Sequence, residues 1–184
     1  VTQAAWECAD PGIQYDDTIN DWHTNPETGR ITASNPCSEY MSLDNSSCNL
    51  ASLNLMKFLK DDGTFDSRNF VKAVELVITA TDISICFADF PTEPIGETTR
   101  AYRQLGIGYA NLGALLMATG HAYDSRGGQT LAAAITSLMT GTAYRRSAEL
   151  AGIVGAYDGF ARNADAHARV MRKHAAANDA IRPV

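Results

Sequence analysis

Residues 35–55 read NPCSEYMSLDNSSCNLASLNL, and this stretch holds two cysteines, Cys37 and Cys48. The first cysteine is framed by Asn35 and Glu39. In a strand-like segment successive side chains alternate between two faces, so the side chains of residues 35, 37 and 39 would point the same way. We therefore expect an amide, a thiol and a carboxylate to share one site.

The length and composition indicate one globular domain. The chain has 184 residues, of which 45% are hydrophobic and 20% charged, values that are typical of soluble proteins with a real core. No run of about 18 apolar residues occurs, and the amino end, VTQAAWECADPG, lacks the basic and apolar stretches of a secretory signal. We therefore expect a cytoplasmic protein with no membrane segment.

The chain starts at Val1 without an initiator methionine and ends in AIRPV directly after a helical pattern, so we expect it to be a piece of a longer protein.

The charge argues against a nucleic-acid-binding site, and the cysteine and histidine patterns argue against a metal site. The formal net charge of −6 argues against a nucleic-acid binder, which normally carries a basic excess. The four cysteines form no C-x-x-C pair and no zinc-finger spacing, so we expect no metal site. His167 and His174 would be separated by roughly 10 Å along a helix, too far apart to bind one metal ion. We expect both to be surface or half-buried residues, and His23 and His121 have no visible partner.

The chain divides into a loop-rich part, residues 1–65, and a mainly helical part, residues 66–184. Turn-forming Asp, Asn, Pro and Gly residues recur in the first part and predict short strands and loops. Asp66 or Ser67 is the expected cap of the first helix and Asn163 that of the last. Four helices are predicted from apolar periodicity, over residues 66–85, 102–119, 126–152 and 164–177. The expected fold class is therefore α/β, weighted toward helix.

Two local patterns have a structural and a functional interpretation. The glycines of GIGYANLG (residues 106–113) do not form G-x-G-x-x-G, because Asn111 stands in place of the third glycine, so we interpret them as close-packing residues. At residues 35–48 the spacing alone leaves two interpretations open. Cys37 and Cys48 are either small buried apolar residues, with Glu39 at the surface and a turn at Asn35 and Pro36, or members of a thiol site. A cysteine hydrolase would need a positioned histidine, for which no local motif is visible.

A family resemblance favours the thiol site. The stretch NPCSEYMSLDNSSCNLASLNL resembles the active-site finger of ribonucleotide reductases, in which an N-x-C-x-E core precedes a second cysteine in a CNL(A/G)S(I/L)NL context. The short spacing between the cysteines, and the proline after the asparagine, are most similar to the adenosylcobalamin-dependent class II enzymes. Further segments across nearly the whole chain also resemble this class: AWECADPGIQYDDTINDWHTNP (5–26), LGIGYANLGALLMATGHAYDS (105–125), AYRRSAELA (143–151) and FARNADAHARVMRKH (160–174).

The resemblance implies a role for each residue of the finger. Cys37 matches the thiyl radical residue that abstracts the 3′ hydrogen of the ribose, and Glu39 matches the carboxylate that takes the 3′-OH proton. Asn35 matches the amide that binds the ribose hydroxyls. Cys48 matches one of the two reducing thiols, whose partner would lie outside this chain. Cys8 and Cys86 are expected to be structural thiols. The substrate would contact the segment Asn35, Pro36, Cys37, Ser38 and Glu39.

The resemblance also implies a setting for these residues. Residues 1–184 would be an internal part of one catalytic domain, a ten-stranded α/β barrel with the finger, residues 34–48, through its centre. The whole protein would convert ribonucleoside diphosphates or triphosphates to deoxy forms, with adenosylcobalamin bound mainly by other regions. Its partners would be a thioredoxin-like or dithiol reductant, nucleotide effectors bound elsewhere, and, in a homodimer, a second copy. Two alternatives stay open: a class I large subunit with a separate radical-generating subunit, and a non-catalytic nucleotide-binding or interaction module. Alone, the chain is expected to be inactive.

Overall fold

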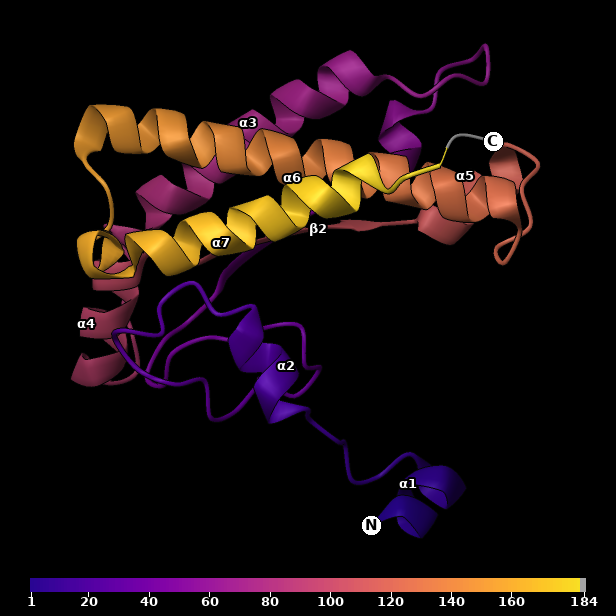
Figure 1. The fold of residues 1–184 in the computed structure, drawn as a ribbon. Helices are drawn as coiled ribbons and strands as arrows, with labels where there is room; N and C mark the ends of the chain where they lie inside the picture. Colours follow the sequence, from indigo (N-terminus) through magenta and orange to yellow (C-terminus); the bar gives the residue numbers. More distant parts are fainter. Residues whose placement is uncertain (183–184) are drawn as a thin grey trace.

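A computed structural model describes residues 1–182 as a helical layer over a small sheet, with a loop-rich segment below (Figure 1). Helices α3, α6 and α7 run alongside one another over the sheet, while α2 lies among the loops and α1 projects away from them (Figure 1). Within the described range no helix is both long and apolar enough to cross a membrane. The elements in chain order are α1 (Thr2–Cys8), α2 (Asp16–Asp21), β1 (Asn49–Asn54), the 3-10 helix η1 (Leu55–Phe58), α3 (Ser67–Ile85), α4 (Glu93–Tyr102), β2 (Leu105–Ala110), α5 (Leu112–Ala118), α6 (Arg126–Val154) and α7 (Phe160–Asp179).

The sheet consists of β1 and β2, which pair in parallel. Their register runs from Asn49 opposite Leu105 to Asn54 opposite Ala110. Parallel neighbours need a long crossover connection, and here α3 and α4 supply it. The residues directly before β1 are 34–48, the segment predicted to be the finger and called the finger below. This segment enters the sheet at the amino end of a strand that is held by β2.

The core lies between the sheet and the helices α3, α5 and α6. Its buried members are apolar side chains from η1 and these three helices: Leu55, Phe70, Val74, Ile78, Leu115, Ile135 and Met139. The prediction of a helix over residues 66–85 is confirmed, and Asp66 caps it by accepting a hydrogen bond from the Asn69 amide at 3.1 Å. The predicted helix after residue 125 is also confirmed, with Ser125 as its cap. The α/β, helix-weighted fold class holds for the described residues.

The prediction of one helix over residues 102–119 is wrong. The first part of this segment is strand β2, and only Leu112–Ala118 is helical. Asn111 separates the two elements with a left-handed backbone, φ 68°. A parallel strand covered on both faces has a nearly continuous apolar sequence, which periodicity alone cannot distinguish from a buried helix. The expected stop at Gly120 agrees with the end of α5 and with the φ of +77° at this glycine.

The last helix is longer than predicted, and Asn163 is not its cap. Helix α7 begins at Phe160, so Asn163 lies inside it, with 1% of its surface exposed. The Asn163 Oδ1 atom accepts from the Glu27 amide at 2.9 Å, and its Nδ2 donates to Thr28 Oγ1 at 2.9 Å. This asparagine therefore fastens α7 to the loop-rich segment instead of starting the helix.

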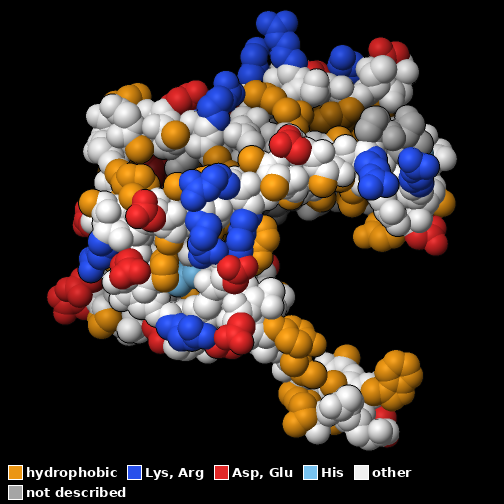
Figure 2. Space-filling view, viewed as in Figure 1, with side chains coloured by type: hydrophobic (Ala, Val, Ile, Leu, Met, Phe, Trp, Pro, Cys, Tyr) orange, Lys and Arg blue, Asp and Glu red, His pale blue; other side chains and the backbone are white. Residues whose placement is uncertain are grey.

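The loop-rich first part agrees with the sequence prediction in character. It contains the two short α-helices α1 and α2, the strand β1 and the 3-10 helix η1. The apolar side chains of its N-terminal arm are exposed: Trp6 by 87% and Tyr15 by 70%. Hydrophobic side chains, drawn in orange, gather on the arm around α1 that projects at the lower right of Figure 2. The rest of that face mixes acidic and basic side chains (Figure 2), so no single-sign patch dominates it.

Candidate functional site

The tip of the finger is a turn. The Ser38 amide donates to the Asn35 carbonyl at 3.1 Å, and Ser38 has a left-handed φ of 66°. The Asn35 side chain supports the turn, because its Oδ1 accepts from the Tyr40 amide at 3.0 Å. The expectation of a strand-like run with residues 35, 37 and 39 on one face is therefore wrong. Pro36 favours the turn, since it fixes φ and has no amide hydrogen for a strand ladder.

The turn places Cys37 at the surface. Cys37 and Glu39 are both exposed, while Asn35 is half-buried. The interpretation of Cys37 as a small core residue is therefore wrong. Asn35, Pro36, Cys37 and Ser38 are held within one four-residue turn, and Glu39 follows it directly. An exposed thiol beside an amide and a carboxylate is open to a ligand that approaches the tip.

Cys48 occupies a different environment. It is half-buried immediately before β1, and its thiol is free. Burial raises the pKa of Cys48, and the negative charge of Glu39 raises it further. Residues 39 and 48 are therefore close enough to interact electrostatically, although they lie at opposite ends of a loop. At neutral pH these influences keep Cys48 as the thiol, the form that can give up a hydrogen atom.

A glycine of the neighbouring strand makes room for Cys48. A Cβ atom at Gly106 would lie 2.7 Å from the Cys48 sulfur and 2.2 Å from Leu50 Cδ2. Both distances are far shorter than a normal van der Waals contact. Gly106 is therefore required where it stands, and the sequence interpretation as a close-packing residue is confirmed for it. The same interpretation is wrong for the other two glycines of the stretch, because a Cβ at Gly108 would meet its nearest atom at 3.8 Å and a Cβ at Gly113 would meet nothing within 4 Å.

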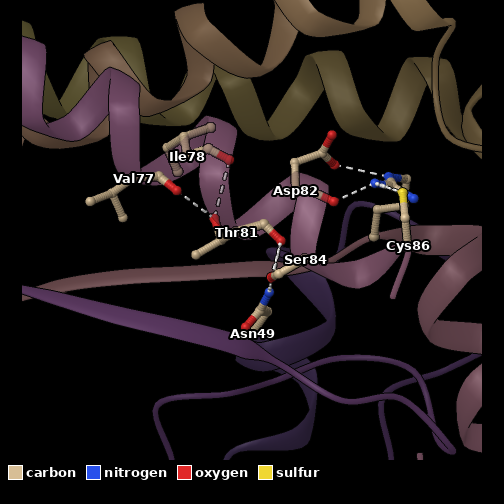
Figure 3. Close-up of polar contacts among 8 residues, drawn as sticks. Asn49, Val77, Ile78, Thr81, Asp82, Ser84 and Cys86 are labelled. Atoms are coloured by element: carbon tan, nitrogen blue, oxygen red, sulfur yellow. Dashed lines mark hydrogen bonds and ion pairs between the residues drawn. The ribbon is translucent and has the colours of Figure 1, made fainter. Parts of the chain in front are cut away.

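Polar contacts fix residues 47–49, where the finger meets β1, to helices α3 and α4. Asn49, the first residue of β1, donates through Nδ2 to the Thr81 carbonyl at 2.7 Å and also bonds to Ser84 (Figure 3). The Ser47 amide donates to Thr99 Oγ1 at 3.0 Å, and Thr99 is 1% exposed. Cys48 lies between these two anchored residues. Its backbone is thus held by α3 on one side and α4 on the other.

The remaining cysteines lie away from the finger. Cys8 is on α1, where its thiol donates to the Ala4 carbonyl at 3.1 Å. Cys86 follows α3 beside Asp82 (Figure 3), and the Arg103 guanidinium donates to both residues. Both cysteines are exposed, and all four cysteines of the described range are free. A structural rather than redox role for Cys8 and Cys86 stays a prediction.

The histidines form no metal site. His167 and His174 are half-buried, as predicted, and burial lowers the pKa of each. His23 is buried and contacts the Gly29 carbonyl at 2.8 Å, and burial lowers its pKa as well. No group of three metal-ligating side chains occurs among residues 1–182.

The comparison with protein families settles what this arrangement belongs to. The model of the ribonucleotide reductase barrel domain matches residues 1–181. The chain belongs to the ribonucleotide reductase family.

Similar proteins agree with the family match. A vitamin B12-dependent ribonucleotide reductase of Streptomyces coelicolor is 77% identical over 182 residues, which cover 97% of this chain and 19% of that protein. One from Rhodopirellula baltica is 49% identical over 181 residues, covering 98% and 17%. A vitamin B12-dependent ribonucleoside-diphosphate reductase of Mycobacterium tuberculosis is 36% identical over 160 residues, covering 87% and 23%. The chain thus spans about a fifth of the length of these curated relatives.

Sequence reasoning on this ribonucleotide reductase segment missed three polar residues that hold the finger. Tyr40, Gln104 and Thr99 bond to the loop between Glu39 and Cys48. Gln104 and Thr99 lie more than fifty residues along the chain from their partners. One local signal could have indicated Gln104: it is a polar residue directly before strand β2.

Proposed function

We propose that the full-length protein is an adenosylcobalamin-dependent ribonucleotide reductase, and that residues 1–184 are an internal part of its catalytic domain. That domain would be a ten-stranded α/β barrel, with residues 34–48 as the finger through its centre. The observation that carries the proposal is the pair of thiols on one loop: Cys37 is exposed at the tip, and Cys48 is half-buried within electrostatic reach of Glu39. The names of the relatives support the same assignment.

The residues of the finger fit a cobalamin cofactor. A corrin ring carries its own cobalt, so the protein needs no cluster of metal ligands, and the described residues offer none. The Cys37 thiol is exposed on a turn, where a bulky group can approach its sulfur. When bound, adenosylcobalamin would supply the radical that takes the hydrogen atom from this thiol and leaves a thiyl radical. The cofactor would be held mainly by regions outside this chain.

Each finger residue then has one task on the ribose. The Cys37 sulfur takes the hydrogen from C3′ and returns it at the end of the cycle. Glu39 accepts the 3′-OH proton while water leaves from C2′, as a general base within hydrogen-bond reach would. Asn35 uses its Oδ1 within the turn, which leaves its amide NH₂ to donate to a ribose hydroxyl. Pro36 and Ser38 would complete the contact with the substrate.

Replacing the 2′-OH by hydrogen consumes two electrons and two protons. Cys48 and a second thiol outside this chain would supply both, so that one water is released and one disulfide is formed. The raised pKa of Cys48 suits this task, because a protonated thiol delivers hydrogen together with its electron. A dithiol or thioredoxin-like reductant would then reopen the disulfide. Nucleotide effectors would bind elsewhere in the full-length protein, which would act as a monomer or homodimer.

The experiment is turnover of a ribonucleoside diphosphate or triphosphate by the full-length protein with and without adenosylcobalamin. We expect deoxynucleotide to form only with the cofactor. Reduction without the cofactor, but with a separate radical-generating subunit, would indicate the class I alternative. Binding of nucleotide with no reduction under either condition would indicate a non-catalytic module.

A second variant tests the role of the carboxylate. Glu39→Gln keeps the shape of the side chain but cannot accept a proton, so kcat should fall by about a hundredfold or more while nucleotide binding is retained. Glu7→Gln, on α1, is a matched control that should leave kcat unchanged. A near-normal kcat for Glu39→Gln would remove Glu39 from the role of base.

A further inference from the structure

Tyr40 closes the loop between Glu39 and Cys48. Its hydroxyl lies 2.8 Å from Ser46 Oγ and 3.3 Å from the Ser47 carbonyl. Tyr40 directly follows Glu39, and Ser47 directly precedes Cys48. One side chain therefore ties together the two ends of the loop that carry the carboxylate and the second thiol.

Gln104 fixes this closed loop to the sheet. The Tyr40 hydroxyl donates to Gln104 Oε1 at 2.6 Å, and Gln104 Nε2 donates in turn to Ser42 Oγ. Gln104 comes directly before β2, and its carbonyl accepts from the Asn49 amide at 3.5 Å. The same residue thus contacts the beginning of the loop, its middle and the strand that follows it.

We propose that Tyr40 and Gln104 are positioning residues of the reductase, whose hydrogen bond fixes the loop that carries Glu39 at one end and Cys48 at the other during reduction. The proposal rests on the proposed function for its catalytic consequence, while the geometry stands independently. Neither residue touches the ribose in this account, so each acts through the loop. Tyr40 is suited to the task because its ring is half-buried and burial raises its hydroxyl pKa, so the hydroxyl stays protonated and keeps donating.

The first test measures the geometry, independently of catalysis. In the full-length protein, the rate of alkylation of Cys48 by iodoacetamide is followed by mass spectrometry after cleavage at Glu39, which separates Cys48 from Cys37. Tyr40→Phe removes one hydroxyl and should speed alkylation of Cys48 by about threefold or more, because the thiol loses burial and the nearby charge of Glu39. Cys8, which is exposed on α1, serves as the internal standard.

Matched variants make the result specific. Tyr109→Phe removes a tyrosine hydroxyl from β2 that bonds instead to Thr136 Oγ1 at 2.8 Å, and it should leave the alkylation rate unchanged. Gln104→Leu should reproduce the effect of Tyr40→Phe, and the double variant should add little to either, since both remove one shared bond. An alkylation rate in Tyr40→Phe equal to that of the unmodified protein would overturn the proposal.

The second test measures the catalytic consequence. Tyr40→Phe should lower kcat by about tenfold to a hundredfold with KM changed by no more than about twofold, because misplaced groups cost rate more than binding. An unchanged kcat in an active enzyme would also overturn the proposal. If the unmodified protein reduces no ribonucleotide, the proposed function fails, whereas the alkylation rates still decide whether Tyr40 and Gln104 position Cys48.

Discussion

Replacing Gly106 by alanine tests whether the Cys48 sulfur packs as tightly against strand β2 as the structure indicates. The added Cβ would lie 2.7 Å from the Cys48 sulfur and 2.2 Å from Leu50 Cδ2. Leu50 is 60% exposed and can rotate away, but the sulfur is half-buried and its backbone is anchored on both sides. Gly108→Ala is the matched control, since a Cβ there would meet its nearest atom, Ser52 Oγ, at 3.8 Å, an ordinary contact.

The magnitude follows from the difference between these two glycines. Neither has a positive φ, so alanine gains about 0.5–1 kcal/mol at each over glycine in a strand. Overpacking at Gly106 costs about 1–3 kcal/mol, which Gly108→Ala avoids. With a urea dependence of about 1–3 kcal/mol per molar, the midpoint of unfolding of Gly106→Ala should lie roughly 1 M below that of Gly108→Ala. Equal midpoints for the two variants would refute the reasoning.

Three further predictions concern buried polar groups. Asn163→Leu should lower the free energy of unfolding by about 1–3 kcal/mol, because the part-buried bonds of Asn163 to the Glu27 amide and to Thr28 Oγ1 are lost, and thermal or urea unfolding would measure it. Burial lowers the pKa of His23 and His167, so the unfolded chain binds protons more readily than the folded chain. The free energy of unfolding should therefore be at its full value at pH 7.5 and fall as the pH drops through about 6.5. A urea midpoint that stays constant over this range would contradict the prediction. Burial and the charge of Glu39 raise the pKa of Cys48, so the pH midpoint for its alkylation should lie above that of an ordinary thiol and should fall in Glu39→Gln. A midpoint that is the same in Glu39→Gln would show that the Glu39 charge does not reach Cys48.

The sequence was sufficient to predict the long helices. Apolar side chains at helical spacing indicated α3 and α6, because each helix buries one stripe against the core. The cap Asp66 further indicated the start of α3. It was insufficient for β2, where Leu105, Ile107 and Tyr109 pack against the core and the residues between them are glycines. Because glycine is not polar, this alternation does not appear as a change between apolar and polar residues. It also misplaced the start of α7, since Asn163 has the right residue type for a cap but pairs with a segment more than a hundred residues away.

For the finger, too, the sequence was sufficient to predict some features and insufficient for others. The residue types and spacing of Asn35, Cys37, Glu39 and Cys48 were sufficient to indicate the family, which the comparison confirms for residues 1–181. They left a strand and a turn at Asn35 and Pro36 as alternatives, and the turn is correct, because the Asn35 side chain bonds to the Tyr40 backbone instead of continuing a strand. They could not indicate the contact of Tyr40 with Gln104, which joins residues 64 positions apart.

The account assigns the radical chemistry to Cys37, and one measurement tests this most directly: reduction of a ribonucleotide by the full-length protein carrying Cys37→Ser, with adenosylcobalamin and a dithiol present. Cys8→Ser and Cys86→Ser are the controls, since both residues are exposed cysteines away from the finger. We expect both controls to keep the rate of the unmodified protein, and Cys37→Ser to form no deoxynucleotide while it still binds the ribonucleotide. Deoxynucleotide formation by Cys37→Ser at the unmodified rate would contradict the account.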